Sequence, residues 1–214
     1  MKRIVLMLSV VLVLLIGVNA SADQFTFQIT IPNTALSSYP APYADVTVTT
    51  PILNSTTATI SVDGLTQGSY TYIIGAAQAF DLNINGIGTA SAFSWTGGNV
   101  NTAFTPGGAG NVSDFGVFNL TIDNFDGFNS AVSALDFTLT LSSGTWANAS
   151  NVLVPNNDGY IAAAHIFVTA PGTSGAVVTG YAGNGQPIPE PATMLLLGSG
   201  LIGLAGFARK KFKK

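Results

Sequence analysis

Residues 4–208 of this chain contain no Lys and no Arg. All seven cationic residues lie at positions 2, 3, 209, 210, 211, 213 and 214. The body at residues 23–188 has nine Asp and no Glu, so its formal side-chain charge is −9. A carboxylate without a cationic partner is costly to bury, so we expect these Asp residues in turns, in solvent or on a metal ion. Nucleic acid and anionic lipid surfaces are excluded as partners of this body, which has nothing to neutralise phosphate.

Alternation of apolar and polar residues predicts an all-β fold. Residues 25–31 alternate over their whole length, which is the pattern of a strand with one buried face. Alternation or β-branched enrichment recurs at 44–50, 57–62, 69–75, 78–84, 90–96, 115–123, 134–142, 160–169 and 176–182. Gly, Pro and Asn separate these segments, and only residues 129–136 compete as a helical window. About ten short strands with such turns predict a β-sandwich of jelly-roll type.

The exported body is expected to be a single domain. The chain has no Cys, so its fold must hold without disulfides, and the body is long enough to bury one hydrophobic core. We place the β-sandwich domain at residues 23–182 and a short linker at residues 183–188.

The first 22 residues have the composition of a Sec signal peptide. A basic start is followed by an uncharged apolar run at residues 4–18 and by the small residues Ala20 and Ala22. The run is shorter than the ~20 residues that span a bilayer. We therefore expect signal peptidase to recognise Ala20 and Ala22 and to release a chain that begins at Asp23.

The C-terminal segment has three parts. Pro189, Glu190 and Pro191 are followed by an uncharged apolar run at residues 192–208. As a helix this run would be about 25 Å long, which can cross the ~30 Å hydrocarbon core with local thinning and snorkelling of flanking basic side chains. The chain then ends in a basic cluster that should stay in the cytoplasm: Arg209, Lys210, Lys211, Lys213 and Lys214.

This order of motif, apolar helix and basic cluster at residues 188–214 resembles the PEP-CTERM sorting signal of Gram-negative bacteria. The resemblance implies that a membrane-embedded exosortase recognises Pro189, Glu190 and Pro191 and cleaves the precursor nearby. It also implies a transient anchor in the inner membrane, followed by delivery to the cell surface or to the exopolysaccharide matrix. It assigns no function to the exported part.

The body offers few groups for catalysis. It has one His, no Cys, no Lys and no Glu, which removes Cys-His nucleophiles, Schiff-base chemistry and multi-His zinc sites. His165 lies in an apolar run and is interpreted as structural; a Ser-His-Asp triad stays open, although no G-x-S-x-G motif frames a nucleophile. The G-x-G-x-x-G at residues 198–203 lacks the strand and acidic residue of a dinucleotide site. We predict no catalytic residue and no cofactor.

Asp-Gly pairs predict tight turns at Asp63-Gly64, Asp126-Gly127 and Asp158-Gly159. Calcium is the alternative at residues 123–129, which gather oxygen ligands. Their spacing does not match a D-x-[DN]-x-[DN]-G loop, and no bidentate Glu follows. No metal site is therefore predicted.

Two functions remain. The first is a non-enzymatic exported protein of the cell surface or extracellular matrix, associated with exopolysaccharide or biofilm. The alternative is a carbohydrate-binding, lectin-like module in the same place, with Trp95 and Trp146 as candidate sugar contacts because each lies beside small polar residues. Both Trp residues could instead pack in or at the rim of the core.

Overall fold

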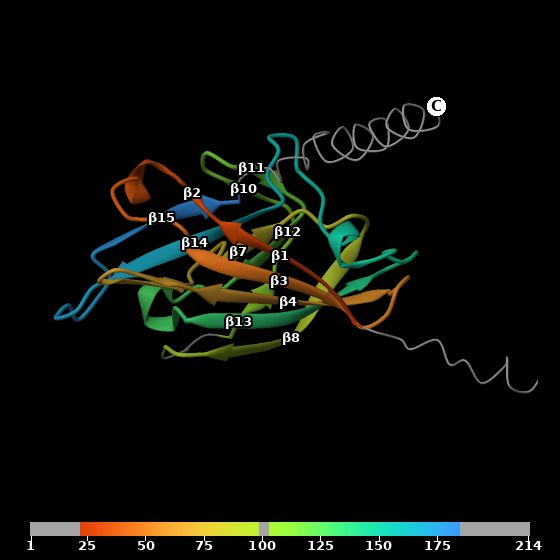
Figure 1. Cartoon of the computed structure of the whole chain (residues 1–214), viewed down its shortest axis with the longest axis horizontal. Coiled ribbons are helices and arrows are strands. Elements are labelled where there is room, and N and C mark those ends of the chain that lie inside the picture. The colour runs from red at the N-terminus through yellow and green to blue at the C-terminus, as the bar shows by residue number, and fades with distance from the viewer. Residues whose placement is uncertain (1–21, 99–102, 185–214) are drawn as a thin grey trace, which may run out of the picture.

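The computed structural model describes residues 22–98 and 103–184, and the regular structure of these residues is almost wholly β-strand (Figure 1). They form fifteen strands and three short 3₁₀ helices, η1 (Thr34–Leu36), η2 (Gly127–Ser130) and η3 (Ala149–Asn151). The all-β prediction is confirmed. The predicted signal peptide apart from Ala22, the end of the predicted linker and the whole predicted sorting signal lie outside the described residues.

One antiparallel sheet has five strands in the order β1-β3-β4-β13-β8. Its strands are β1 (Asp23–Ile29), β3 (Ala44–Thr50), β4 (Thr57–Gly64), β13 (Ala134–Leu141) and β8 (Gly88–Thr96). The register between β8 and β13 shifts between Asp136 and Thr138, and Ala92 of β8 has a φ of 52°. A bulge of this kind on an edge strand discourages pairing with other chains.

A second sheet has eight strands. Its main order is β2-β15-β14-β7-β12-β9, while β6 also pairs with β14 and β5 pairs with β6. The strands are β2 (Ile31–Pro32), β5 (Thr66–Gln67), β6 (Tyr70–Ile74), β7 (Phe80–Leu82), β9 (Thr105–Pro106), β12 (Leu120–Asp123), β14 (Ala162–Thr169) and β15 (Val178–Gly183). A separate hairpin joins β10 (Gly110–Val112) to β11 (Gly116–Phe118).

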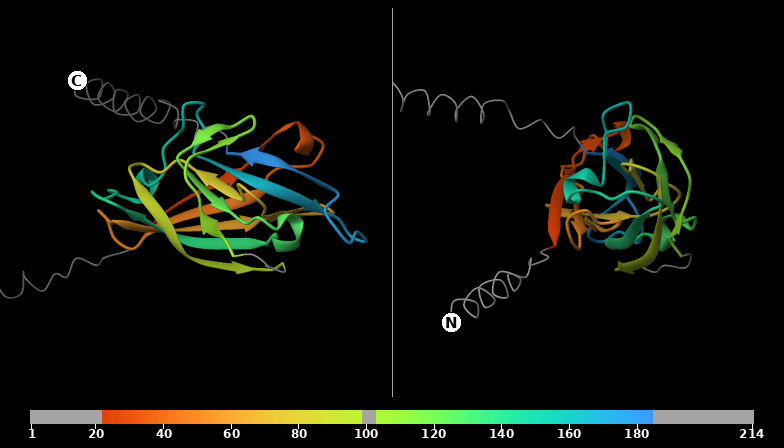
Figure 2. Two further views of the ribbon diagram at one scale, coloured as in Figure 1. Left: turned by 180° about the vertical axis from the view of Figure 1, so that it is seen from behind. Right: turned by 90° about the vertical axis from the view of Figure 1, so that its right-hand side faces the viewer.

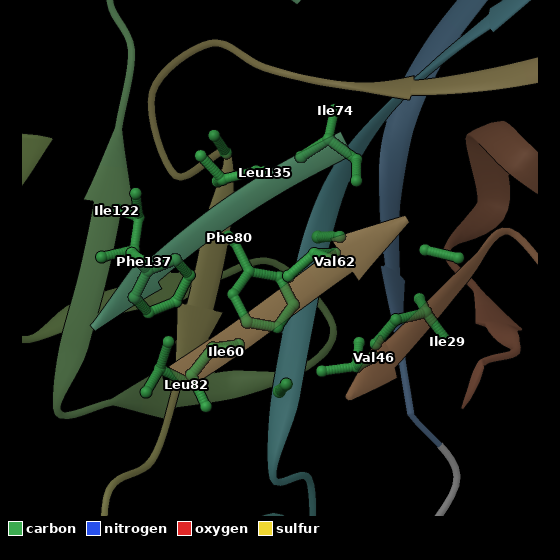
Figure 3. Packing of buried hydrophobic residues seen from close by; sticks show 14 of the residues in the cluster. Ile29, Val46, Ile60, Val62, Ile74, Phe80, Leu82, Ile122, Leu135 and Phe137 are labelled. Carbon is green, nitrogen blue, oxygen red and sulfur yellow. The ribbon is translucent and has the colours of Figure 1, made fainter. Parts of the chain in front are cut away.

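The two larger sheets share one hydrophobic core. Figures 1 and 2 agree in placing β14 and β15 on the opposite side of the molecule from β13 and β8. Phe137 of β13 meets Phe80 of β7 with ring centroids 6.2 Å apart, and both side chains are buried (Figure 3). Each fully buried side chain of this size contributes about 1.5–3 kcal/mol by leaving water. Because the inner face of each sheet belongs to this core, only the outer faces can contact a ligand.

A smaller cluster lies on the outer face of the eight-stranded sheet. Val112, Phe115 and Phe118, from β10, β11 and the turn between them, pack with Ala163 of β14. We call residues 105–118 the cover segment. Because this segment packs on the sheet, part of the sheet's outer face is also buried.

The ten predicted strand segments all contain strands, and the predicted bounds 44–50 are those of β3. The strand count differs for two reasons. β2, β5, β9 and β10 are two or three residues long and are held by tertiary pairing rather than by a sequence pattern, and the segment 115–123 contains two strands, β11 and β12. The possible helix at 129–136 is absent: η2 ends at Ser130, and from Ala134 the chain alternates in β13 with Leu135 and Phe137 buried. The jelly-roll sandwich stays a prediction.

Candidate functional site

The outer face of the five-stranded sheet is lined with hydroxyl groups, and we call it the hydroxyl face. Register places three rows of residues across β1, β3, β4, β13 and β8. These rows are Gln28, Asp45, Asp63, Ala134, Thr96; then Thr26, Thr47, Ser61, Asp136, Ser94; then Gln24, Thr49, Thr59, Thr138, Ser91. β-Branched Thr suits a pleated strand, and its hydroxyl keeps the outward face wet.

This hydroxyl face can bind a ligand through hydrogen bonds rather than through stacking. Neighbouring strands are about 4.7–4.9 Å apart, so donors and acceptors repeat at that spacing across the sheet. Gln28 Nε2 donates to Asp45 Oδ1 at 2.9 Å, and Gln24 Nε2 donates to Thr49 Oγ1 at 3.3 Å. A shallow groove of about 370 Å³ lies along β1 and β3, lined by Thr26, Phe27, Gln28, Asp45 and Thr47.

Three carboxylates make the hydroxyl face anionic. Asp45 and Asp63 stand directly opposite each other, and Asp136 faces the neighbouring Ser61. Partial burial and the charges of Asp136 and Asp45 raise the pKa of Asp63, whereas a hydrogen bond from Ser61 lowers it. The face therefore repels anionic ligands and favours neutral or cationic ones.

The two candidate Trp residues lie in different surroundings. Trp146 is 2% exposed and belongs to the main core, and its Nε1 donates to the carbonyl of Asn85 at 2.9 Å. Its ring is not available to a sugar. Trp95, at the edge strand β8, is 38% exposed, and its ring packs 5.7 Å from that of Phe104. Of these two Trp residues, only Trp95 offers part of its ring to a ligand.

His165 has a structural environment. Its Nε2 lies 2.8 Å from Thr179 Oγ1 and its Nδ1 lies 3.3 Å from the carbonyl oxygen of Ala77. The ring stacks on those of Tyr181 and Phe167, with centroids 4.4 and 5.0 Å away. Burial lowers the pKa of His165, and the Ala77 contact partly offsets it. In a Ser-His-Asp triad, a Ser would take the place of Thr179 beside Nε2, and a carboxylate would take the place of the Ala77 carbonyl beside Nδ1.

The three Asp-Gly pairs have different local backbone structures. Asp158-Gly159 forms the predicted turn: Gly159 has a φ of 91°, and its N–H donates to the carbonyl of Asn156 at 3.1 Å. Asp126-Gly127 stands at the start of η2, where Gly127 has a φ of 59°. The turn prediction at Asp63-Gly64 is wrong, because both residues belong to β4. A Cβ on Gly64 would lie 2.2 Å from the carbonyl oxygen of Tyr72, so close strand packing selects this glycine.

The oxygen atoms of residues 123–129 face different partners. Asp123 Oδ1 accepts from the N–H of Gln78 at 2.7 Å, whereas Asp126 Oδ2 accepts from Ser130 Oγ at 3.3 Å. The side chain of Asp123 thus points toward the loop before β7, and that of Asp126 points toward η2. The segment does not form the local calcium loop that was the alternative prediction.

Sequence reasoning missed Asp81. This residue is 0% exposed, and neither carboxylate oxygen has a hydrogen-bond partner among the described residues. Burial, and then the charge of Asp123, raise the pKa of Asp81 to about 8. Asp81 stands between Phe80 and Leu82 in an alternating segment, which predicts an outward, solvated side chain. It is buried because the cover segment packs on that face, and nothing in the local pattern signals this.

The membrane and sorting predictions fall outside this body. Among residues 22–98 and 103–184, no helix is long and apolar enough to cross a membrane. The predicted helix at residues 192–208 and the basic cluster lie beyond the described part of the chain.

Comparison with known families identifies the C-terminal segment. Residues 187–210 match the profile of the PEP-CTERM protein-sorting motif. The chain carries a PEP-CTERM sorting motif. The matched residues include Pro189, Glu190 and Pro191 and extend into the basic cluster as far as Lys210. The PEP-CTERM motif marks the protein as an exosortase-sorted extracellular protein. Searches of curated proteins and of solved structures found no match, so the body has no assignment from relatives.

Proposed function

We propose that the body is a non-enzymatic component of the exopolysaccharide-rich cell surface or biofilm matrix of a Gram-negative bacterium. The match of residues 187–210 to the PEP-CTERM motif carries this proposal, because it sends the protein outside the cell. Two features of the body support it. The only His has structural contacts at both ring nitrogens, and residues 4–208 have no Cys, Lys or Arg and only one Glu, in the sorting motif itself.

The proposed route has two cleavages. Signal peptidase removes residues 1–22 after Ala22, and an exosortase cuts near Glu190. Until the second cut, residues 192–208 anchor the precursor in the inner membrane and the basic cluster stays in the cytoplasm. The released body has then lost all seven cationic residues of the chain, so it leaves the membrane as an anionic domain.

Glu190→Ala should abolish exosortase cleavage and surface delivery. The substitution removes the one carboxylate of the motif while leaving the apolar run and the basic cluster in place. We expect a precursor that keeps residues 192–214 and fractionates with the inner membrane. Intact-mass measurement on protein recovered from exporting cells checks this, because trypsin finds no Lys or Arg at residues 4–208.

The matched control is Asp158→Asn, which removes a carboxylate from an exposed turn of the body. This variant should be cleaved and delivered like the wild type. Normal cleavage and localisation of Glu190→Ala would contradict the sorting role of the motif.

The alternative function is carbohydrate binding, and the hydroxyl face is the observation that favours it. We propose that an extended neutral or amine-bearing polysaccharide lies across the rows of Thr and Ser on this face. Hydroxyl and amide groups can exchange hydrogen bonds with sugar hydroxyls, and Asp45, Asp63 and Asp136 would pair with amino groups. The same carboxylates argue against an anionic glycan.

Replacing Thr47, Thr59 and Thr138 together by Val should weaken polysaccharide binding about tenfold or more. Each lost hydrogen bond contributes about 0.5–1.5 kcal/mol, and Val keeps the shape and the β preference of Thr. Affinity electrophoresis in gels that contain a neutral polysaccharide measures the change. Thr105→Val, on the exposed strand β9 of the other sheet, is the control and should bind normally. If the triple variant bound the polysaccharide normally and Trp95→Ala did not, the binding site would lie at the edge strand β8 and not on the hydroxyl face.

A further inference from the structure

The eight-stranded sheet contains an acidic side chain whose charge no group of the described residues compensates. Asp81 is 0% exposed, and its two oxygens have no hydrogen-bond partner in the described part of the chain. No Lys or Arg occurs anywhere in residues 4–208 to pair with it. A buried carboxylate in this position costs several kcal/mol unless a proton or a cation neutralises it.

A second carboxylate shares the same face of the sheet. Asp81 on β7 stands opposite Thr121 on β12, and Asp123 follows Thr121 by two residues, so all three side chains project from the outer face. Asp123 is held in place by the N–H of Gln78, which donates to Oδ1 at 2.7 Å, and by Thr121 Oγ1, which donates to Oδ2 at 3.1 Å. The charge of Asp123 contributes to the raised pKa of Asp81 after burial, so the two carboxylates are close enough to repel each other, and hydrogen bonds fix the side chain of Asp123.

The cover segment closes over this pair. A Cβ on Gly107 would lie 2.5 Å from Asp123 Oδ2, and a Cβ on Gly110 would lie 3.8 Å from Asp81 Oδ1. Gly107 thus lets the backbone approach Asp123 more closely than a side chain would permit, whereas Gly110 lies at ordinary contact distance from Asp81. Gln78 Nε2 donates to the carbonyl of Asn111 at 3.1 Å, which ties the segment to the loop before β7. The cover segment therefore buries this part of the outer face, where the oxygen atoms of Asp81 have no hydrogen-bond partner among the described residues.

We propose that Asp81 and Asp123 form a binding site for one divalent cation of the calcium class, with their two carboxylates as its charged ligands. Thr121 Oγ1 is a further hard oxygen atom, 3.1 Å from Asp123 Oδ2, and Ca²⁺ completes its six to eight ligands with carbonyl groups and water. The described residues contain no group of three or more His, Cys, Asp or Glu that could hold a metal ion. With only two charged ligands, the affinity belongs in the range of extracellular modules, about 10⁻⁴–10⁻³ M.

Binding a cation here would fasten the cover segment to the sheet. β9 pairs with β12 through Pro106 and Thr105, and the cation would add a link between β7, β12 and this segment. The competing explanation is that Asp81 carries a proton, which is consistent with its raised pKa. Cation binding predicts that added calcium stabilises the protein, whereas a protonated Asp81 predicts no response to calcium.

Terbium is a suitable probe because Tb³⁺ replaces Ca²⁺ and emits when a nearby Tyr is excited. The Tyr181 hydroxyl lies 3.5 Å from Gln78 Oε1, and the charges of Asp81 and Asp123 contribute to its raised pKa. Protein recovered from exporting cells and freed of metal with a chelator should show saturable Tb³⁺ emission that Ca²⁺ displaces. Asp81→Asn should lose this emission, and Asp123→Asn should weaken Tb³⁺ binding about tenfold or more.

Asp114→Asn is the matched control, since it removes one exposed charge from the turn between β10 and β11 and should bind Tb³⁺ normally. Calcium should also raise the Tm of the wild-type protein by several degrees over its value in chelator. This second measurement decides the matter if Asp81→Asn does not fold. No Tm response to Ca²⁺, or Tb³⁺ emission unchanged in Asp81→Asn, overturns the proposal.

Discussion

Trp146→Ala should lower the free energy of unfolding by about 3–5 kcal/mol, as large aromatic deletions in cores do. The ring is 2% exposed and is surrounded by the residues of the main core. Its removal leaves a cavity and also deprives the carbonyl of Asn85 of the Nε1–H donor at 2.9 Å. Urea denaturation followed by far-UV circular dichroism measures the change, because fluorescence would lose one of two Trp signals.

Trp95→Ala is the control. That side chain is 38% exposed and packs on Phe104 at the edge of the sheet, so its removal should cost clearly less than that of Trp146. If Trp146→Ala cost under about 1 kcal/mol, the ring would not be the core residue described here. The comparison also affects binding experiments. A loss of sugar binding in Trp146→Ala has to be corrected for its unfolded fraction, whereas the same loss in Trp95→Ala would report a surface contact.

The long strands could be predicted from sequence because each has one buried and one solvated face. In β3, Val46 and Val48 face the core while Asp45 and Thr47 face outward, and the alternation alone gives the bounds of the strand. The same logic identifies β4 and β13. Alternation also predicts that outward positions are polar, but the rows of the hydroxyl face become visible only when the register between strands is known.

The cover segment could not be predicted because its structure depends on distant contacts. β9 and β10 are two and three residues long and carry no periodic pattern, and β9 exists because Pro106 pairs with Ile122. The burial of Asp81 depends in turn on this segment. Local sequence therefore indicated the wrong environment for Asp81, the acidic residue that is buried without a hydrogen-bond partner among the described residues. The PEP-CTERM motif is the opposite case, since its signal is contained in consecutive residues.

Asparagine side chains make hydrogen bonds to backbone groups in this protein, a role that charged side chains fill in many others. Asn119 Oδ1 accepts from the N–H of Ile84 and its Nδ2 donates to the carbonyl of the same residue, both at 2.8 Å. Asn156 Nδ2 donates to the carbonyl of Phe115 at 2.8 Å, which fastens the cover segment to the turn before β14. A neutral amide can satisfy buried backbone groups without a counter-charge, which a chain lacking Lys and Arg at residues 4–208 could not supply.

Asn184→Ala should lower the free energy of unfolding by about 2–5 kcal/mol, because two buried backbone donors lose their acceptor. Asn184 is 2% exposed, and its Oδ1 accepts from the N–H groups of Ile161 and Ala162 at 2.9 and 3.0 Å. These bonds hold the end of β15 against β14 where the chain leaves toward the sorting motif. Pulse proteolysis in urea, with an enzyme that cuts at apolar residues, measures the loss. Asn157→Ala, at an exposed position, should change little, and equal stability of the two variants would show that the Asn184 bonds contribute nothing.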